Sequence, residues 1–388
     1  MGKKHQRMKK IMVKTMGNES YQGITVALFC IFLSLLAGAV LLLALGKNPL
    51  LAYKSILQGA GLWAKPRYAG HRSIITDFMS LLNYVTPMLF ASLSVALALR
   101  CGLFNICVSG MMIFSGFTAS VLIGYSDLSS WLAKPLVILI GIIAGGLIGV
   151  LIGFLKHRFN TNEVVSSIML NYIIAYVSSF FIQTRFIDPV TRQSMKINEA
   201  ARLTLTDTVV GNLKMDIPLL LPIGILIVAG LAFLLKRTKL GFDLKAVGMN
   251  PKASRYAGIN VGRTMVTAMA LSGVFAGLAG VTYFLGTFAS LQPKVLPDTG
   301  FDAIAVALLG NQSPFGCLLA SLLVMTINNG TTYMSSKLGV LREIASLITS
   351  ILLLVSACSG FIRYLVNKYK QELEENRKEE DSLEETKL

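Results

Sequence analysis

Residues 135–155 read PLVILIGIIAGGLIGVLIGFL, a run of 21 residues without a charged side chain. An α-helix rises about 1.5 Å per residue, so about 20 apolar residues cross the roughly 30 Å of hydrocarbon in a bilayer. Runs of the same kind lie at residues 24–45, 78–99, 101–126, 164–184, 217–235, 264–293 and 344–362. Each of these runs is predicted to form a membrane-spanning helix.

A further apolar stretch, residues 303–336, is interrupted by the sequence NQSP at residues 311–314. Polar residues followed by proline favour a turn, so this stretch is predicted to form a short span, a turn and a second span. No apolar segment alternates as a strand would, and helices satisfy their own backbone hydrogen bonds in lipid. The predicted fold class is therefore all-α, a polytopic integral membrane bundle of about ten transmembrane helices.

The composition agrees with this fold class. Hydrophobic residues make up 54% of the 388 residues and charged residues only 14%, whereas soluble domains have about 25% charged residues. The net charge of +16 would suggest a nucleic-acid partner in a soluble protein, but here the charges flank apolar runs. We therefore expect a multi-pass protein of the cell membrane and no nucleic-acid partner.

Basic residues indicate the orientation, because cytoplasmic loops carry an excess of Lys and Arg. Loop 236–263 has seven basic residues against Asp243, and the N-terminal segment has six against Glu19. Ten spans place both termini and this loop in the cytoplasm. One loop disagrees: residues 47–77, placed outside, carry five basic residues and one acidic residue, and their length suggests a folded external hairpin.

Three regions follow from this topology. They are a basic cytoplasmic segment at residues 1–23, a transmembrane domain at residues 24–366, and a charged cytoplasmic tail at residues 367–388.

The loop at residues 236–263 reads KRTKLGFDLKAVGMNPKASRYAGINVGR. It is too long for a tight turn, and its glycines and proline divide it, which predicts one or two short helices with small residues exposed. Small side chains allow another protein to approach closely. A positively charged loop that faces lipid is the alternative.

This loop resembles the cytoplasmic coupling loop of ATP-binding-cassette (ABC) importer permeases of the ribose, branched-chain amino acid and nucleoside superfamily. Further similar segments follow in the same order: CGLFNICVSGMM at 101–112, TNEVVSSIMLNY at 161–172, ALSGVFAGLAGV at 270–281 and GFDAIAVALLGNQSPF at 300–315. The strings NEVVSSIMLNY and ASRYAGIN look most like the nucleoside-uptake branch. Ser109 stands where that branch usually has an acidic residue.

The resemblance implies a permease subunit of an ABC importer, most similar to those that take up nucleosides. A sugar permease of the ribose or galactose type, a branched-chain amino acid permease and an ion-coupled secondary transporter are the alternatives. The implied partners are ABC ATPase subunits, a second permease chain and an extracellular substrate-binding lipoprotein or binding protein. The implied coupling residues are Gly241, Ala246, Gly248, Asn250, Arg255, Ala257 and Gly258.

No catalytic or metal site is expected in this chain. The three histidines are far apart in sequence, no CxxC pair occurs, and the chain lacks the Gly-x4-Gly-Lys-Ser/Thr motif that cradles phosphate. The chain is therefore not expected to be an enzyme or to bind a cofactor, and ATP with Mg²⁺ is expected on the partner subunits.

Polar residues inside the spans have two interpretations. They can line a substrate pathway, or they can form hydrogen bonds between helices. Asn105 and Ser109 are four residues apart and share a helical face, as do Ser167 and Asn171. The candidates for the substrate pathway are Asn83, Asn105, Ser109, Ser167, Asn171 and Asn328. By contrast, Gly273, Gly277 and Gly280 are predicted to serve close helix packing.

Overall fold

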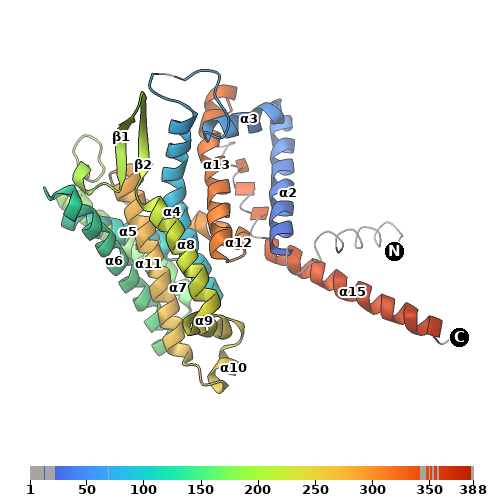
Figure 1. Ribbon diagram of the computed structural model, residues 1–388. Coiled ribbons are helices and arrows are strands. Elements are labelled where there is room, and N and C mark those ends of the chain that lie inside the picture. Colours follow the sequence, from blue (N-terminus) through green and yellow to red (C-terminus); the bar gives the residue numbers. More distant parts are fainter. Residues whose placement is uncertain are drawn as a thin grey trace. The chain divides into compact units, whose positions relative to one another are not determined.

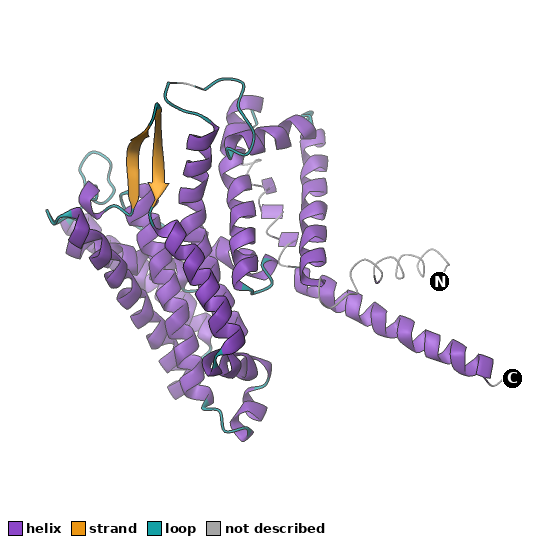
Figure 2. Ribbon diagram, viewed as in Figure 1, coloured by secondary structure: helices purple, strands orange, loops and turns teal. Residues whose placement is uncertain are grey.

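The computed structural model describes Val13 and residues 22–68, 70–340, 347–348, 350–351, 354–355 and 358–385. The chain divides into two compact units, one formed by residues 1–49 and 347–388 and the other by residues 50–346. Both units are mainly helical in their described parts, as Figures 1 and 2 show. The N-terminal segment 1–23 lies almost entirely outside the described residues.

The first unit contains helix α2 (Gln22–Ala44) and helix α15 (Ser359–Glu385). The two helices pack through Val26 and Cys30 of α2 and through Ile362 and Val366 of α15. The side-chain amide of Gln22 also donates a hydrogen bond of 2.6 Å to Asn367. The charged tail is helical as far as Glu385.

The second unit holds most of the apolar helices. In chain order its elements are α3 (Pro49–Gly59), α4 (Ile74–Arg100), α5 (Val108–Ala119), the π-helix η1 (Ser120–Gly124), α6 (Ser130–Phe159), α7 (Glu163–Arg185), the 3₁₀ turn η2 (Glu199–Ala201), β1 (Thr204–Val210), β2 (Leu213–Pro218), α8 (Leu220–Arg237), α9 (Lys239–Met249), α10 (Pro251–Tyr256), α11 (Val261–Val281), the π-helix η3 (Thr282–Phe288), α12 (Asp298–Leu309) and α13 (Pro314–Leu338).

Seven helices of the described residues are long and apolar enough to cross a membrane. They are α2, α4, α6, α7, α8, α11 with η3, and α13. Residues 303–336 divide as predicted, because α12 ends at Leu309 and α13 begins at Pro314. In the predicted span at 344–362, residues 344–346, 349, 352–353 and 356–357 lie outside the described ones. The polytopic helical fold is thus confirmed.

Two expectations about the elements were wrong in detail. Residues 101–107 are not helical, and the helix that follows, α5 with η1, is only 17 residues long (Val108–Gly124). The predicted span 217–235 begins later, because Ile217 and Pro218 belong to strand β2. Strands β1 and β2 form an antiparallel hairpin that the sequence analysis did not predict (Figure 2). Gly211 in its turn has φ +63°, a conformation that glycine adopts without strain.

Helix α11 lies in the core of the second unit and packs closely on α6. A Cβ added at Gly145 of α6 would lie 2.7 Å from the Cα atom of Gly277, and one added at Gly277 would lie 3.2 Å from the Cα atom of Gly145. On another side of α11, Gly280 faces Met112 and Ser115 of α5. The prediction that these glycines serve helix packing is confirmed.

The second unit has two ends, which we call the α9–α10 end and the hairpin end. At the α9–α10 end, Gly248 of α9 meets the last turn of α4, and His157 of α6 meets Gly262 of α11. The salt bridge Lys156–Glu163, of 2.9 Å, joins α6 to α7 there. At the hairpin end, Asn83 near the start of α4 contacts strands β1 and β2. Figure 1 shows these two ends at opposite extremes of the long helices.

Candidate functional site

The α9–α10 segment forms two short helices, as the sequence predicted, and each has its own cap. The Thr238 hydroxyl accepts a hydrogen bond from the backbone N–H of Gly241 at the start of α9. The Asn250 side chain accepts from the N–H groups of Lys252 and Ala253, and Pro251 occupies the first turn of α10. These side chains satisfy backbone donors that a helix start leaves free, so the segment has a defined shape.

The α9–α10 surface is exposed around α10. Met249 is 78% exposed and Tyr256 is 94% exposed, although both are large apolar or aromatic side chains. Asn250, Arg255, Ala257 and Gly258 are exposed beside them. Exposed apolar groups between basic residues are typical of a surface that another protein covers.

Two of the small residues in this segment face the chain itself. A Cβ added at Gly248 would lie 3.0 Å from the carbonyl carbon of Arg100, and one added at Gly241 would lie 2.6 Å from the Cα atom of Leu235. Ala246 is half-buried. The expectation that the small residues are exposed therefore holds for Ala257 and Gly258 and is wrong for Gly241 and Gly248.

A basic cleft adjoins this surface. A cavity of about 350 Å³ lies between the end of α4, helix α9 and the α12–α13 turn, and its lining includes Arg100, Lys245 and Met249. Arg100 donates through Nε to the backbone carbonyl of Gln312, at 3.1 Å, which ties α4 to the turn.

Two of the predicted pathway residues, Asn105 and Asn171, hold the non-helical segment 101–107. Asn105 donates to the Ser272 hydroxyl at 2.8 Å and accepts from the backbone N–H of Cys107 at 2.9 Å. Asn171 accepts from the N–H of Gly110 at 2.7 Å and donates to the carbonyl of Ile106 at 2.9 Å. The geometry therefore favours a role for both side chains in hydrogen bonding between elements.

Two other candidates also have partners. The Ser109 hydroxyl donates to the carbonyl of Pro297 at 2.8 Å. Asn83 donates to the carbonyl of Asp216 at 2.9 Å and accepts from the Thr204 hydroxyl at 3.0 Å. None of these partners is itself a candidate for the pathway. Asn328 is half-buried in α13.

Ser167 differs from the other candidates. Its hydroxyl is buried in α7 and has no hydrogen-bond partner among the described residues. A free buried hydroxyl is available to a substrate or a water molecule.

A cavity of about 220 Å³ lies at the end of α11 that is remote from α9. Aromatic rings from η3 and amides from two connecting segments line it; the lining residues are Gln193, Tyr283, Phe284, Phe288, Ser290, Gln292, Val295 and Pro297. The ring centroids of Tyr283 and Phe288 are 4.6 Å apart, and Tyr84 of α4 meets Phe288 edge-on at 6.4 Å. We call it the Tyr283 cavity.

The wall of the Tyr283 cavity is held in place by backbone hydrogen bonds. The N–H of Leu291 donates to the Ser194 hydroxyl at 2.8 Å, and the N–H of Ser194 donates to the carbonyl of Leu291 at 2.9 Å. The N–H of Lys294 donates to the Ser179 hydroxyl of α7 at 2.6 Å. The segment 289–297 is therefore anchored on both sides of the cavity.

Sequence reasoning missed the Tyr283 cavity. Tyr283 and Phe288 lie inside the apolar run 264–293, and hydropathy does not separate aromatic residues that line a cavity from those that face lipid or the core. Gln193 lies in a long connection between two predicted spans. The signal in the sequence was the pair of aromatic residues close to Gln292 at the end of that run.

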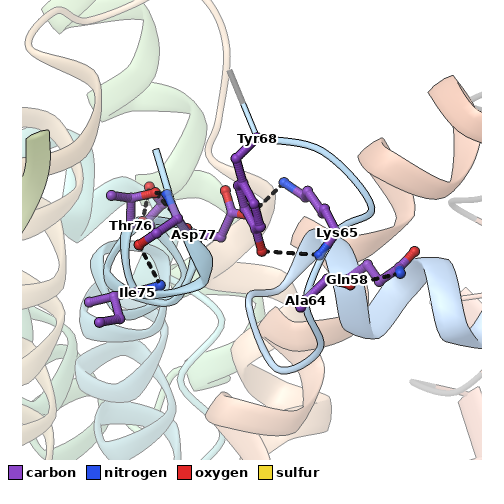
Figure 3. Close-up of polar contacts among 9 residues, drawn as sticks. Gln58, Ala64, Lys65, Tyr68, Ile75, Thr76 and Asp77 are labelled. Atoms are coloured by element: carbon purple, nitrogen blue, oxygen red, sulfur yellow. Dashed lines mark hydrogen bonds and ion pairs between the residues drawn. The ribbon is translucent and has the colours of Figure 1, made fainter. Parts of the chain in front are cut away.

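The connection between α3 and α4 is fixed to the helices around it, as Figure 3 shows. The Gln58 amide of α3 donates to the carbonyl of Ala64 at 2.9 Å, and Lys65 forms a salt bridge of 2.6 Å with Asp77 of α4. The ammonium group of Lys65 also lies 4.7 Å from the ring centroid of Tyr333 in α13. One of the basic residues that opposed the predicted orientation is thus paired within the chain.

These features define the class of the protein: a polytopic α-helical membrane permease with an exposed two-helix segment at one end and an aromatic cavity toward the other. The chain belongs to the family described as branched-chain amino acid transport system / permease component, whose model matches residues 78–357. It is thus a transport protein of the cell membrane rather than an enzyme, as predicted. ABC permeases of this family act with ATPase and substrate-binding partners.

Two relatives align over nearly all of the chain. The nucleoside ABC transporter permease protein NupB of Lactococcus lactis subsp. cremoris is 34% identical over 91% of this chain and 96% of its own length. The guanosine ABC transporter permease protein NupP of Bacillus subtilis is 33% identical over 89% of this chain and 96% of its own length. The glucose ABC transporter permease protein TsgB13 of Haloferax volcanii is 26% identical over 71% of this chain. No solved structure matches the chain significantly.

Proposed function

We propose that this chain is the membrane-spanning subunit of an ABC importer that takes up nucleosides. The observation that carries the proposal is the similarity to NupB and NupP along almost their entire lengths, because both are named for nucleoside or guanosine transport. The similarity to the glucose permease covers less of the chain and is weaker, so a sugar permease is the second candidate.

The proposed topology has ten spans with both termini in the cytoplasm. The seven long helices, the shorter pieces α5–η1 and α12, and the predicted span at 344–362 together make this number. The basic residues gathered at the α9–α10 end, including Lys245, Lys252 and Arg255, support a cytoplasmic position for it.

The proposed partners follow from the two ends. The surface formed by Met249, Tyr256, Ala257 and Gly258 docks on an ABC ATPase subunit, where ATP and Mg²⁺ bind. The permease pairs with a second permease chain, and the hairpin end receives substrate from an extracellular binding lipoprotein or binding protein. ATP-driven movement of the α9–α10 segment then alternates the bundle between outward and inward openings. Ser167 and Asn328 remain candidates for the pathway.

Reconstitution tests the proposal. The permease, its ATPase and its binding protein are placed in proteoliposomes, and uptake of labelled uridine, inosine, ribose, glucose and leucine is measured with and without ATP. ATP-dependent uptake of the two nucleosides supports the proposal. Uptake of a sugar or leucine without nucleoside uptake contradicts it, and so does ATP hydrolysis by the purified permease alone.

A further inference from the structure

We propose that the Tyr283 cavity binds the heterocyclic base of the nucleoside on its way through the permease. This inference rests on the proposed function and adds the site and the part of the substrate that the site recognises. The cavity comprises an aromatic wall from η3, an apolar wall from Val295 and Pro297, and the amides of Gln193 and Gln292.

The aromatic wall suits a flat π-system. Phe288 packs on Tyr283 and is still 48% exposed, so part of its surface remains free to contact a ligand. Bases stack on aromatic side chains whatever their identity, because every base has a π-face. The wall can therefore accept purines and pyrimidines alike.

The polar groups of the cavity suit the edge of a base. Gln193 accepts a hydrogen bond from the Ser290 hydroxyl at 2.6 Å through its carbonyl oxygen, a bond that leaves its NH₂ group unused. Gln292 is exposed beside it and offers both a donor and an acceptor. Each base carries donors and acceptors along one edge. Two neighbouring amides can therefore pair with that edge while the faces of the base contact the aromatic and apolar walls.

Size limits the cavity to part of a nucleoside, and polarity argues against a sugar in the same place. The volume of about 220 Å³ is below the roughly 300–1,000 Å³ of pockets that enclose drug-sized ligands, so the cavity holds a ring system and not a whole nucleoside. A sugar has hydroxyls around its entire rim, and those that face Val295 and Pro297 would lose their hydrogen bonds to water. The ribose of a nucleoside then lies outside the cavity, toward its opening.

Substrate protection of an introduced cysteine tests the site. In a background without the five native cysteines, Gln292→Cys is labelled in the assembled transporter with a membrane-impermeant maleimide, in the presence of inosine, uridine or ribose. We expect both nucleosides to slow the labelling several-fold and ribose to leave it unchanged. Val190→Cys, in an exposed loop of the same unit (89% exposed), is the control and should be labelled equally in every case.

A second variant measures the aromatic wall. Phe288→Ala should raise the nucleoside concentration for half-maximal protection roughly fivefold to a hundredfold, because stacking of one base on an aromatic ring is worth about that factor. Phe233→Ala is the matched control, since Phe233 of α8 is 65% exposed and does not line the cavity. If Gln292→Cys fails to assemble, Val295→Cys, which also lines the cavity, replaces it.

Two results overturn the inference. One is nucleoside transport by the wild-type complex without any protection of either cysteine, which leaves the proposed function intact. The other is protection by ribose as strong as that by inosine, which makes the cavity a sugar site. Failure of the wild type to transport any nucleoside instead removes the proposed function itself.

Discussion

The contact between α9 and α4 can be tested by adding a single methyl group. Gly248→Ala would place a Cβ 3.0 Å from the carbonyl carbon of Arg100 and 3.1 Å from that of Cys101, and closer still to the carbonyl oxygen of Arg100. All three atoms belong to the backbone of another element and cannot rotate away. Helix α9 must therefore move off the end of α4.

The expected cost follows from this geometry. Overpacking a close contact typically costs about 1–3 kcal/mol. Alanine in place of glycine also favours a helix by up to about 1 kcal/mol, which partly hides the clash. Gly230→Ala in α8 isolates the clash, because an added Cβ there meets nothing within 4 Å. The difference between the two variants should therefore be about 1–3 kcal/mol.

The assay has two readouts. Thermal unfolding of the purified complex should show a lower midpoint for Gly248→Ala than for Gly230→Ala. ATP-driven uptake should also fall in Gly248→Ala, because a displaced α9 no longer transmits motion to α4. Equal midpoints and equal uptake in the two variants would refute the reasoning, since the backbone contact at Gly248 would then not exist in the working protein.

Three further predictions follow from described contacts. Ala257→Trp, on the exposed surface of the α9–α10 segment, should leave thermal stability unchanged and abolish co-purification of the ATPase; an intact complex that transports normally would move the docking surface elsewhere. Gly277→Leu should lower the unfolding midpoint markedly, because the backbone of α6 at Gly145 leaves no room for a side chain. A wild-type midpoint would contradict the close packing of α11 on α6. Lys65→Met should destabilise the connection between α3 and α4 by leaving the carboxylate of Asp77 unpaired, and adding Asp77→Asn should restore part of the loss; equal stability of the single and double variants would count against the salt bridge.

The sequence predicted those parts of the fold that depend on local properties. Charge-free length identifies a span because the bilayer has a fixed thickness, so most of the long helices lie where expected. The glycines and the proline within 236–263 predicted its short helices, because the residues that begin and end a helix act over only a few positions. The spacing of Gly273 and Gly277 likewise predicted close packing, although the partner helix α6 could not be read from it.

The parts that the sequence missed depend on residues far apart in the chain. Segment 101–107 is apolar enough to pass for helix, yet Asn105 and Asn171 hold it in a non-helical path through bonds to Ser272 and to Ile106. Hydropathy cannot distinguish a small residue that is exposed from one that packs on α4, as Ala257 and Gly248 illustrate. The Tyr283 cavity depends on tertiary hydrogen bonds that join the segment 193–197 to residues 289–291, which follow the π-helix η3.

The contacts of Asn105 and Ser109 join the two ends of the second unit. Gly248 of α9 packs on Gly102, in the segment that Asn105 fixes to α11 through Ser272. The same segment leads into α5, where the Ser109 hydroxyl donates to the carbonyl of Pro297, which lines the Tyr283 cavity. An unpaired polar group inside a membrane bundle is costly, so a movement that separates these partners costs free energy. A shift of α9 therefore either breaks these bonds or moves the bonded elements with it. On this view Asn105 and Ser109 serve transport by linking the α9–α10 end to the cavity rather than by touching substrate.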